Sequence, residues 1–218
     1  MKKVMILLLM VVFAVGIADA RKRKSRAGEI SDSVYTDNKY NFSLVISDKW
    51  DTSIKKDDSK VRLILIKKQY DIPNEYRHAP TYTQVPKVIV YVDTSSLPTP
   101  VFVDSLISDK FKSGQKNEML QEFKLLFGDF VPEKRSKMSV GDVEGIKVSG
   151  ERRYTLNVQR QGIDGDRADL VTNYYGGSLF FIKKENTLII FHFICEKVYF
   201  TAEDADFTKL IESFKFVE

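Results

Sequence analysis

The sequence contains very few of the residues that most often perform covalent or metal chemistry. It has one cysteine, Cys195, and two histidines, His78 and His192. A single cysteine excludes an intramolecular disulfide. Neither histidine has a second ligand at a spacing typical of metal sites. We therefore predict that the chain holds no metal and no cofactor.

Motifs of enzyme active sites are also absent. There is no G-x-S-x-G nucleophile motif, no P-loop and no dinucleotide-binding fingerprint. His192 and Cys195 lie three positions apart in one apolar stretch, so in a strand they would point to opposite faces. This disfavours a Cys–His pair and predicts that Cys195 is a buried core residue. We predict no catalytic residues and no enzymatic activity.

The segment Asp164-Gly165-Asp166-Arg167-Ala168-Asp169 resembles the start of a calcium-binding loop. Ala168 stands where that motif needs an oxygen ligand, and no glycine occupies the sixth position. Asp-Gly is a strong signal for a tight turn between strands. We therefore expect a turn here and not a metal site.

The N-terminus has the three parts of an export signal. Lys2 and Lys3 precede the apolar run Val4–Ile17, and Ala18-Asp19-Ala20 offers small residues for signal peptidase. The run is shorter than the about 20 residues that span a bilayer. We predict a signal peptide over residues 1–20 and a periplasmic or secreted protein. The alternative is a membrane anchor formed by the uncleaved segment.

Basic residues follow the expected cleavage site directly: Arg21, Lys22, Arg23, Lys24 and Arg26. The whole chain has a net charge of +4, so the chain outside this tail carries a slight negative charge. A nucleic-acid-binding domain normally carries its basic residues on a folded face, so we predict no nucleic-acid partner. We predict that residues 21–33 form a basic, disordered leader. One interpretation is that this leader is only a solvated tail. The alternative is that its basic residues make weak contact with anionic membranes.

Several segments have the patterns of strands. Tyr40–Ile46 alternates between apolar and polar residues, and Val61–Ile66 and Val88–Val92 are short apolar runs typical of strands covered on both faces. Further strands are predicted at Val143–Ser149, Arg152–Val158, Leu170–Tyr175, Leu179–Lys183 and Leu188–Cys195. The last two should form a hairpin, with Leu188–Cys195 at the centre of the sheet.

Three segments have helical patterns. Thr99-Pro100 is a plausible helix start, and a second segment includes Phe123 and Phe127. In the last helix Thr201 and Asp204 approximate a capping box, and a stripe at helical spacing follows: Phe207, Leu210, Ile211 and Phe214. Strands outnumber helices and most links are short. The predicted fold class is α+β, an antiparallel-dominated β-sheet flanked by helices, in one domain over residues 34–218.

The order of these elements resembles that of the PsbP-like superfamily. The resemblance rests on the opening strand Tyr40–Ile46 followed by Trp50, the mid-chain helical pair, the late hairpin and the final segment Phe207–Phe216. It implies an α/β/α sandwich. Members include photosystem II extrinsic subunits, a Ran-binding nuclear transport factor and uncharacterised exported proteins. The superfamily has no common catalytic residues, so the resemblance implies a binding role by association only.

The stretch Gln69–Pro86 contains three prolines and has no periodicity, which predicts a long loop. It carries residue types enriched at binding hot spots, namely Tyr70, Tyr76, Arg77, His78 and Tyr82. One hypothesis is that this loop binds a partner. The competing hypothesis is that its tyrosines cover one face of the sheet as a satellite core.

Three functions from different classes remain open at this point. The first is an exported, non-catalytic binding or assembly module whose partner is another envelope protein. The second is an envelope or lipid-associated protein docked through the basic tail. The third is an enzyme whose carboxylates converge in a site that no motif reveals.

Overall fold

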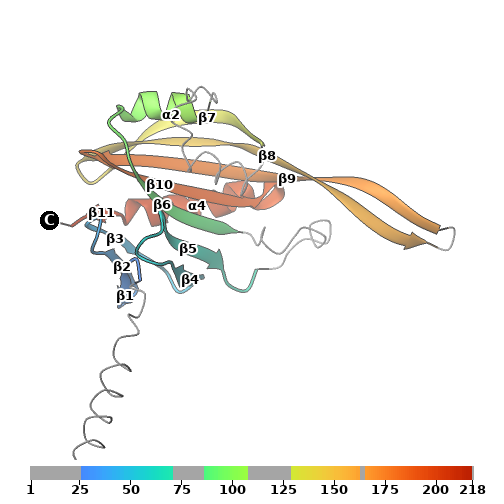
Figure 1. The fold of residues 1–218 in the computed structure, drawn as a ribbon, viewed down its shortest axis with the longest axis horizontal. Helices are drawn as coiled ribbons and strands as arrows, with labels where there is room; N and C mark the ends of the chain where they lie inside the picture. The colour runs from blue at the N-terminus through green and yellow to red at the C-terminus, as the bar shows by residue number, and fades with distance from the viewer. Residues whose placement is uncertain (1–25, 71–85, 108–128, 163–164, 218) are drawn as a thin grey trace, which may run out of the picture.

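The computed structural model describes residues 26–70, 86–107, 129–162 and 165–217. Its main element is a seven-stranded antiparallel sheet with the strand order β4-β5-β6-β10-β9-β8-β7 (Figure 1). Its strands are β4 Trp50–Ile54, β5 Val61–Lys67, β6 Lys87–Thr94, β7 Asp129–Val140, β8 Val143–Gly162, β9 Gly165–Lys184 and β10 Thr187–Glu196.

A second, smaller sheet is formed by segments from both ends of the chain. It has the order β1-β2-β3-β11, with β1 Glu29–Ser31, β2 Val34–Asp37, β3 Phe42–Val45 and β11 Lys215–Phe216. The alternation predicted around Tyr40–Ile46 is confirmed, since Phe42, Leu44 and Ile46 are all buried. This sheet therefore presents one apolar face to the large sheet.

Two helices cover opposite faces of the large sheet. Helix α4, Phe200–Glu212, follows the short 3-10 helix η3, Lys197–Tyr199, and packs on β9 and β10. Together with the small sheet it encloses the larger core, which contains Phe207, Leu210 and Ile211. Helix α2, Thr99–Ile107, covers the other face through Phe102 and Val103. This arrangement confirms the predicted α+β class with an antiparallel-dominated sheet between helices.

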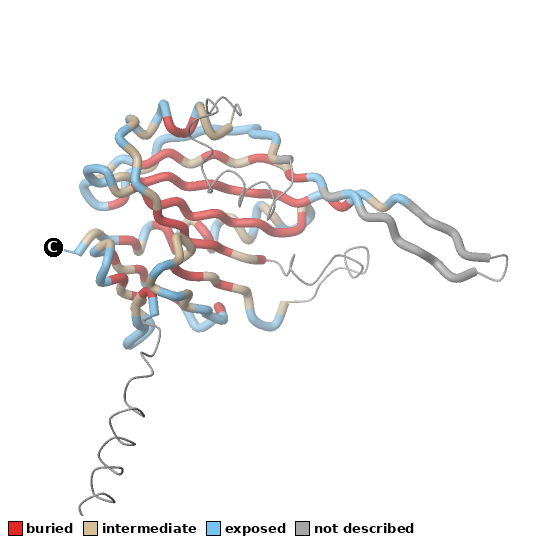
Figure 2. Tube along the Cα trace, viewed as in Figure 1, coloured by how far each residue is buried: buried red, intermediate tan, exposed pale blue. Residues whose placement is uncertain are grey.

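Strand β10 lies at the centre of the large sheet, as its composition predicts. It pairs with β6 on one side and β9 on the other, and every residue from Leu188 to Glu196 is buried. The tube in Figure 2 shows this buried centre in red. The predicted hairpin with β9 is also confirmed, because Thr187 pairs with Lys184 across a two-residue turn. Phe191, Phe193 and Cys195 belong to the core under α4, and Leu188, Ile190 and Ile194 to the core under α2.

The long strands β8 and β9 differ from the prediction. The sequence divides each of them in two, at Gly150 and at Gly176-Gly177, but both strands run through these glycines without interruption. The glycines mark places where another group comes close. A Cβ atom on Gly150 would lie 2.1 Å from the carbonyl oxygen of Val131 in β7. Gly150 therefore allows β8 to lie close to β7 at a position where the sequence predicts the end of a strand.

Two further expectations about the ends of the chain are corrected. Part of the expected disordered leader is folded: Glu29–Ser31 forms β1, and Ala27 is buried because its N–H donates to the carbonyl of Lys55. Its polar composition gave no sign of this pairing.

Thr201 does not cap α4, which starts one residue earlier and has no side-chain cap. The second predicted helix, with Phe123 and Phe127, lies outside the described residues.

Candidate functional site

A hairpin arm projects from one end of the large sheet. Its two strands are the outer parts of β8 and β9, residues 154–162 and 165–174, which extend well beyond the other strands (Figures 1 and 2). Among the described residues, β7 pairs with β8 only as far as Arg153, and β10 pairs with β9 only as far as Tyr175. Beyond these residues the arm is a two-stranded ribbon. The turn predicted near Asp164-Gly165 agrees with the pairing of Gly162 with Gly165.

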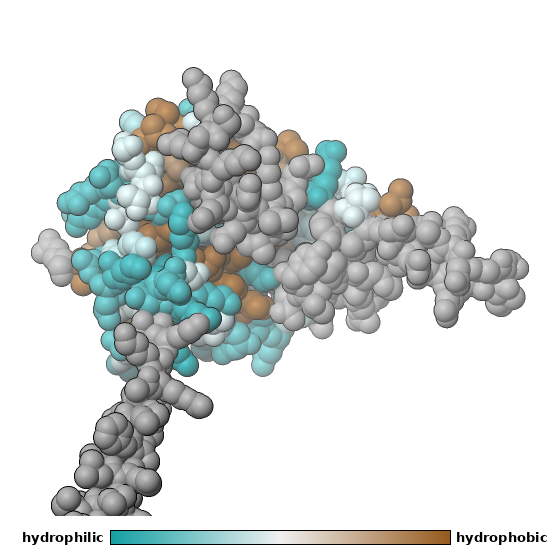
Figure 3. Space-filling view, in the orientation of Figure 1, coloured by the Kyte–Doolittle hydropathy of each residue, from teal (hydrophilic) through white to brown (hydrophobic). Residues whose placement is uncertain are grey.

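Exposed apolar side chains gather where the arm leaves the body. We call them the arm-base surface: Val131, Leu170, Tyr174, Val198 and Tyr199. Leu170 and Val198 are the most exposed, at 77% and 65%. In Figure 3 apolar surface is visible on the described part of the arm. Apolar side chains scattered singly over a surface are common, but a group of them next to a projecting element is typical of an interaction site.

Strand pairing brings these residues to one side of the sheet. Val131 in β7 is opposite Glu151 in β8, and Glu151 is opposite Gly176 in β9. A Cβ atom on Gly176 would lie 2.1 Å from the ring of Phe200, so the start of α4 lies directly on β9 at this point. Val198 and Tyr199 precede Phe200, and Tyr174 lies two residues further out on β9. The surface is therefore formed by three segments that are distant in sequence.

Charged residues are interspersed with this apolar group. The Nζ atom of Lys197 lies 3.4 Å from Glu133 and 3.5 Å from Glu151. Arg153 donates from Nε to Glu151 at 3.2 Å, and its guanidinium lies 5.9 Å from the centre of the Tyr174 ring. The hydrogen bond from Arg153 lowers the pKa of Glu151, which keeps this carboxylate charged. Aromatic rings beside arginine, bordered by ion pairs, are common in protein interfaces.

Of the five predicted binding residues in the loop, Tyr70 is the one that the structure describes. Its hydroxyl donates to Oε2 of Glu196 at 2.7 Å, and its ring makes an edge contact with Tyr199 at 5.9 Å. Burial and the hydrogen bond to Glu196 raise the pKa of Tyr70, so it remains a donor. Tyr70 thus packs against Tyr199 and is hydrogen-bonded to Glu196. The other four loop residues, Tyr76, Arg77, His78 and Tyr82, lie outside the described residues.

Glu196 is a fully buried carboxylic acid at the end of β10. Its Oε1 atom has no hydrogen-bond partner among the described residues, and burial raises its pKa. Beside it, burial and the neighbouring Glu196 raise the pKa of the Cys195 thiol. A thiol in such surroundings is a poor nucleophile because the reactive thiolate does not form. This agrees with the prediction that Cys195 is a core residue.

His192 lies on the opposite face of β10 from Cys195, as its position in the strand predicts. Burial lowers the pKa of His192 well below its ordinary value, with a further contribution from the charges of Arg152 and Lys87. Arg152 itself is 3% exposed and lies over the ring of Phe130 at 5.0 Å. The sheet therefore separates His192 from Cys195, and the two cannot act as a catalytic pair.

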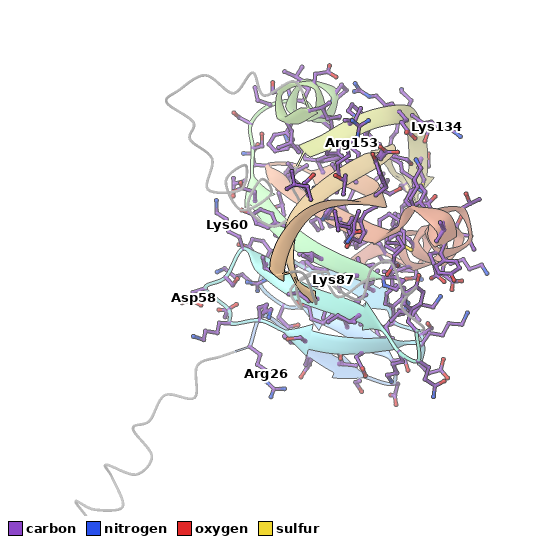
Figure 4. The ribbon with its side chains drawn as sticks, turned by 90° about the vertical axis from the view of Figure 1, so that its right-hand side faces the viewer. Arg26, Asp58, Lys60, Lys87, Lys134 and Arg153 are labelled. Atoms are coloured by element: carbon purple, nitrogen blue, oxygen red, sulfur yellow. The ribbon has the colours of Figure 1, made fainter. Side chains whose placement is uncertain are left out.

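The basic tail enters the fold on a different part of the molecule. Arg26 is exposed and forms an isolated backbone bridge with Lys56, at the edge beside β4. In Figure 4, Arg26 and Asp58 lie on the lower part of the molecule, whereas Arg153 lies on the upper part. Arg21, Lys22, Arg23 and Lys24 lie outside the described residues. The tail and the arm-base surface are thus separate features.

No three or more His, Cys, Asp or Glu residues in the described part of the chain are placed to share a metal ion. No described helix combines the length and the apolar composition needed to cross a bilayer.

Comparisons with known proteins find similarity only at the level of structure. No protein-family model matches the chain, and no curated protein sequence matches it. A cyanobacterial PsbP from Synechocystis sp. PCC 6803 is similar over 87% of this chain and 96% of that chain, at 10% identity and a TM-score of 0.48.

Two further solved structures are similar at comparable levels. LpqN of Mycobacterium tuberculosis, a protein involved in cell envelope biogenesis, is matched over 81% of this chain and 83% of its own, with 9% identity and a TM-score of 0.44. The Ran-binding protein Mog1p of Saccharomyces cerevisiae is matched over 87% of this chain and 97% of its own, with 7% identity and a TM-score of 0.47. All three matches have identities of 10% or less and TM-scores below 0.5, so they assign neither a family nor a role to this chain.

Proposed function

We propose that this chain is an exported, non-catalytic module that binds another protein of the cell envelope through the arm-base surface. The observation that supports this proposal is the group of exposed apolar residues around the projecting arm, with tyrosine and arginine among them. Truncation of such residues usually removes most of the binding energy of an interface. Tyr76, Arg77, His78 and Tyr82, which follow Tyr70 in the sequence, remain candidate binding residues on the evidence of the sequence.

Around the arm-base surface, the described side chains favour binding over an enzymatic reaction. The buried Glu196 is near this surface, but one of its carboxyl oxygens accepts the hydrogen bond from Tyr70. The raised pKa of Cys195 keeps its side chain in the thiol form. General acid–base catalysis requires a group within reach of a substrate proton. The side chain of Glu196 is 0% exposed. We assign Glu196 to the support of the surface and not to catalysis.

The proposal is tested with a variant that changes the surface and leaves the fold intact. Val131→Thr, Tyr174→Thr and Val198→Ser together remove three exposed apolar side chains. A matched control, Ile30→Thr, Val45→Thr and Val101→Ser, removes three exposed apolar side chains located elsewhere. Tagged forms of each protein are incubated with the envelope fraction of the source cells, and the captured proteins are quantified by mass spectrometry.

We expect a partner that is captured by the wild type and the control but falls at least tenfold with the arm-base variant, while the melting temperatures agree. Equal capture by all three proteins would overturn the arm-base surface as the binding site. A separate triple variant, Tyr76→Ala, Arg77→Ala and His78→Ala, tests the loop. Lower capture at an unchanged melting temperature would include the loop in the surface, and lower melting with intact capture would assign it to packing.

The basic tail supports a second contact, with anionic lipid. The bridge between Arg26 and the exposed residue Lys56 fixes the end of the tail to the folded domain. Cations close to an anionic membrane each contribute about 1 kcal/mol, an effect that salt screens. Vesicles containing anionic lipid should bind the protein at low salt and lose it when residues 21–26 are deleted. Binding that survives this deletion would show that the tail is only a solvated leader.

A further inference from the structure

One edge of the arm presents backbone groups that no described residue satisfies. On one side β9 pairs with β8 along its whole length, to Gly162–Gly165. On the other side the pairing with β10 stops at Tyr175. An isolated two-stranded hairpin is only marginally stable in water, and an open strand edge is a template for a further strand. Within the described part of the chain, the outer part of β9 therefore pairs on one side alone.

The pairing pattern determines which residues of β9 face this open edge. Hydrogen bonding alternates along an antiparallel ladder, and the residues that close a two-residue turn bond to each other. Gly162 and Gly165 close one such turn, and Lys184 and Thr187 close another. Both turns give the same result, namely that odd-numbered residues of β9 bond to β8. The N–H and C=O groups of Asp166, Ala168, Leu170 and Thr172 accordingly face outward.

We propose that this edge pairs with the same edge of a second copy of the chain, antiparallel, about a two-fold axis at Ala168. In that register Arg167 stands opposite Asp169 of the second copy, and the pair occurs twice because the contact is symmetric. Moving the axis by one residue places two Arg167 or two Asp169 residues opposite each other, and like charges directly opposite are destabilising. Moving it to Leu170 pairs Asp169 with Val171. The charges therefore select Ala168.

The pairing within the arm supports the same register. In the register of the arm, Arg160 of β8 is the partner of Arg167, so two arginine positions are already paired within one copy. Asp169 of a second copy would take the register position on the other side of Arg167, where an acidic residue is favourable. The other edge of the arm is formed by residues 154–162 of β8. This segment contains no acidic residue that could pair with Arg160 of a second copy. The β9 edge is thus the self-complementary one.

The shape of the molecule allows this contact. The overlap runs over residues 165–171 of each copy, which lie in the outer part of the arm and away from the body (Figure 1). Because the strands run antiparallel, the two bodies lie at opposite ends of a four-stranded ribbon. So short an overlap buries less surface than a standard interface, so we expect a weaker dimer than an obligate one. Of the arm-base surface only Leu170 lies in this overlap. The contact does not use Val131, Tyr174 or Val198, so the variant that tests the proposed function leaves this contact unchanged.

Cysteine cross-linking tests the register directly. In an antiparallel pair, directly opposite residues have Cβ atoms about 4.5–5.5 Å apart, so a cysteine on the axis can form a disulfide with its own copy. Ala168→Cys is compared with Leu170→Cys and Thr172→Cys, which face the same edge but lie off the axis. The native Cys195 is buried and does not interfere. Under mild oxidation, we expect dimers from Ala168→Cys at a rate at least tenfold above the other two. Equal or slower cross-linking at Ala168 would overturn the register.

A charge exchange tests the proposal without a covalent bond. Asp169→Arg places arginine opposite arginine, and we expect the dimer dissociation constant measured by sedimentation to rise at least tenfold. The double variant Arg167→Asp with Asp169→Arg restores opposite charges and should restore the dimer. Circular dichroism and the melting temperature check that each variant is folded. A wild type that stays monomeric at every concentration tested, or a double variant as weak as the single one, would overturn the proposal.

Discussion

The guanidinium of Arg62 and the carboxylate of Asp37 form an ion pair that is completely shielded from water. Nε of Arg62 lies 2.6 Å from Oδ2 of Asp37, and both side chains are 0% exposed. The pair joins β5 of the large sheet to β2 of the small one. Tyr35 donates its hydroxyl to the same carboxylate at 3.1 Å, and Arg62 also donates to the carbonyl of Ala27 at 2.9 Å. These bonds attach the N-terminal segment to the body.

We predict that Arg62→Met lowers the free energy of unfolding by about 3–5 kcal/mol, because it leaves the carboxylate of Asp37 buried without its counter-charge. The double variant Arg62→Met with Asp37→Leu should be less destabilised than Arg62→Met alone, since no uncompensated charge remains. Urea denaturation of the two variants and the wild type measures both effects. A loss below about 1 kcal/mol for Arg62→Met would show that water reaches Asp37.

Leu210 tests the docking of α4 on the sheet. It lies in the buried stripe of the helix and is 5% exposed. Leu210→Ala should lower the free energy of unfolding by about 2–5 kcal/mol, through lost burial and the cavity left behind. Lys209→Ala, on the exposed face of the same helix, is the control and should change it by less than about 0.5 kcal/mol. Similar values for the two variants would mean that the helix is not packed against the sheet.

Gly176 and Phe200 test the contact beneath the arm-base surface. A methyl group at position 176 would lie 2.1 Å from the Phe200 ring, so the ring or the strand must shift. We expect Gly176→Ala to cost about 1–3 kcal/mol of stability, as over-packed sites do. The double variant Gly176→Ala with Phe200→Ala should lose less stability than the sum of the losses of the two single variants, because the clash is absent when residue 200 is alanine. Strict additivity in thermal or chemical denaturation would indicate that the two residues are not in contact.

Glu196 should make stability depend on pH in an unusual direction. Burial raises its pKa in the folded protein above the ordinary value of 4.5 for a glutamate side chain. As the pH rises through that value, the unfolded chain releases this proton before the folded chain does. The contribution of Glu196 to stability is therefore complete at low pH and is lost as the pH rises towards the folded pKa.

We predict that Glu196→Gln removes this loss, so that its stability relative to the wild type improves between about pH 4.5 and neutrality. Gln can still accept the hydrogen bond from Tyr70. The control is Glu144→Gln, since Glu144 is 57% exposed in an ion pair with Lys137. Urea midpoints across this pH range compare the three proteins. A Glu196→Gln variant whose difference from the wild type does not change with pH would show that Glu196 is not protonated in the folded state.

The export signal predicts a defined N-terminus for the mature protein. Cleavage after Ala20 leaves Arg21 as the first residue. Intact-mass spectrometry of the protein recovered from the periplasm or the medium should give the mass of residues 21–218. A protein that retains Met1 and sediments with the membranes would instead show that the apolar segment is an anchor.

Local pattern was sufficient for the elements that bury one continuous face. The alternation of Phe42 and Leu44, the apolar run of β10 and the stripe through Phe207 and Leu210 all correspond to buried positions. Each of these patterns follows from the geometry of a single strand or helix, which places every second or every third to fourth residue on one face. The α+β class could be predicted for this reason.

The arm and the arm-base surface could not be predicted in this way. Val131, Tyr174 and Val198 are single apolar residues in polar surroundings, and nothing in their local sequence distinguishes them. They come together only because β7, β8 and β9 pair in one register and η3 lies against β9. Of the five predicted binding residues in the loop, only Tyr70 has a described position, and its ring contacts Tyr199.

By itself, the sequence of this protein determined the periodic elements, the antiparallel class of the sheet and the residues of a predicted export signal, because each depends on neighbours within one segment. The tertiary structure alone decided where β8 and β9 extend beyond the neighbouring strands, and which exposed residues these strands bring together. Register and strand length depend on the partner strand, and glycines such as Gly150 and Gly176 act as breaks or as close contacts according to what lies opposite them.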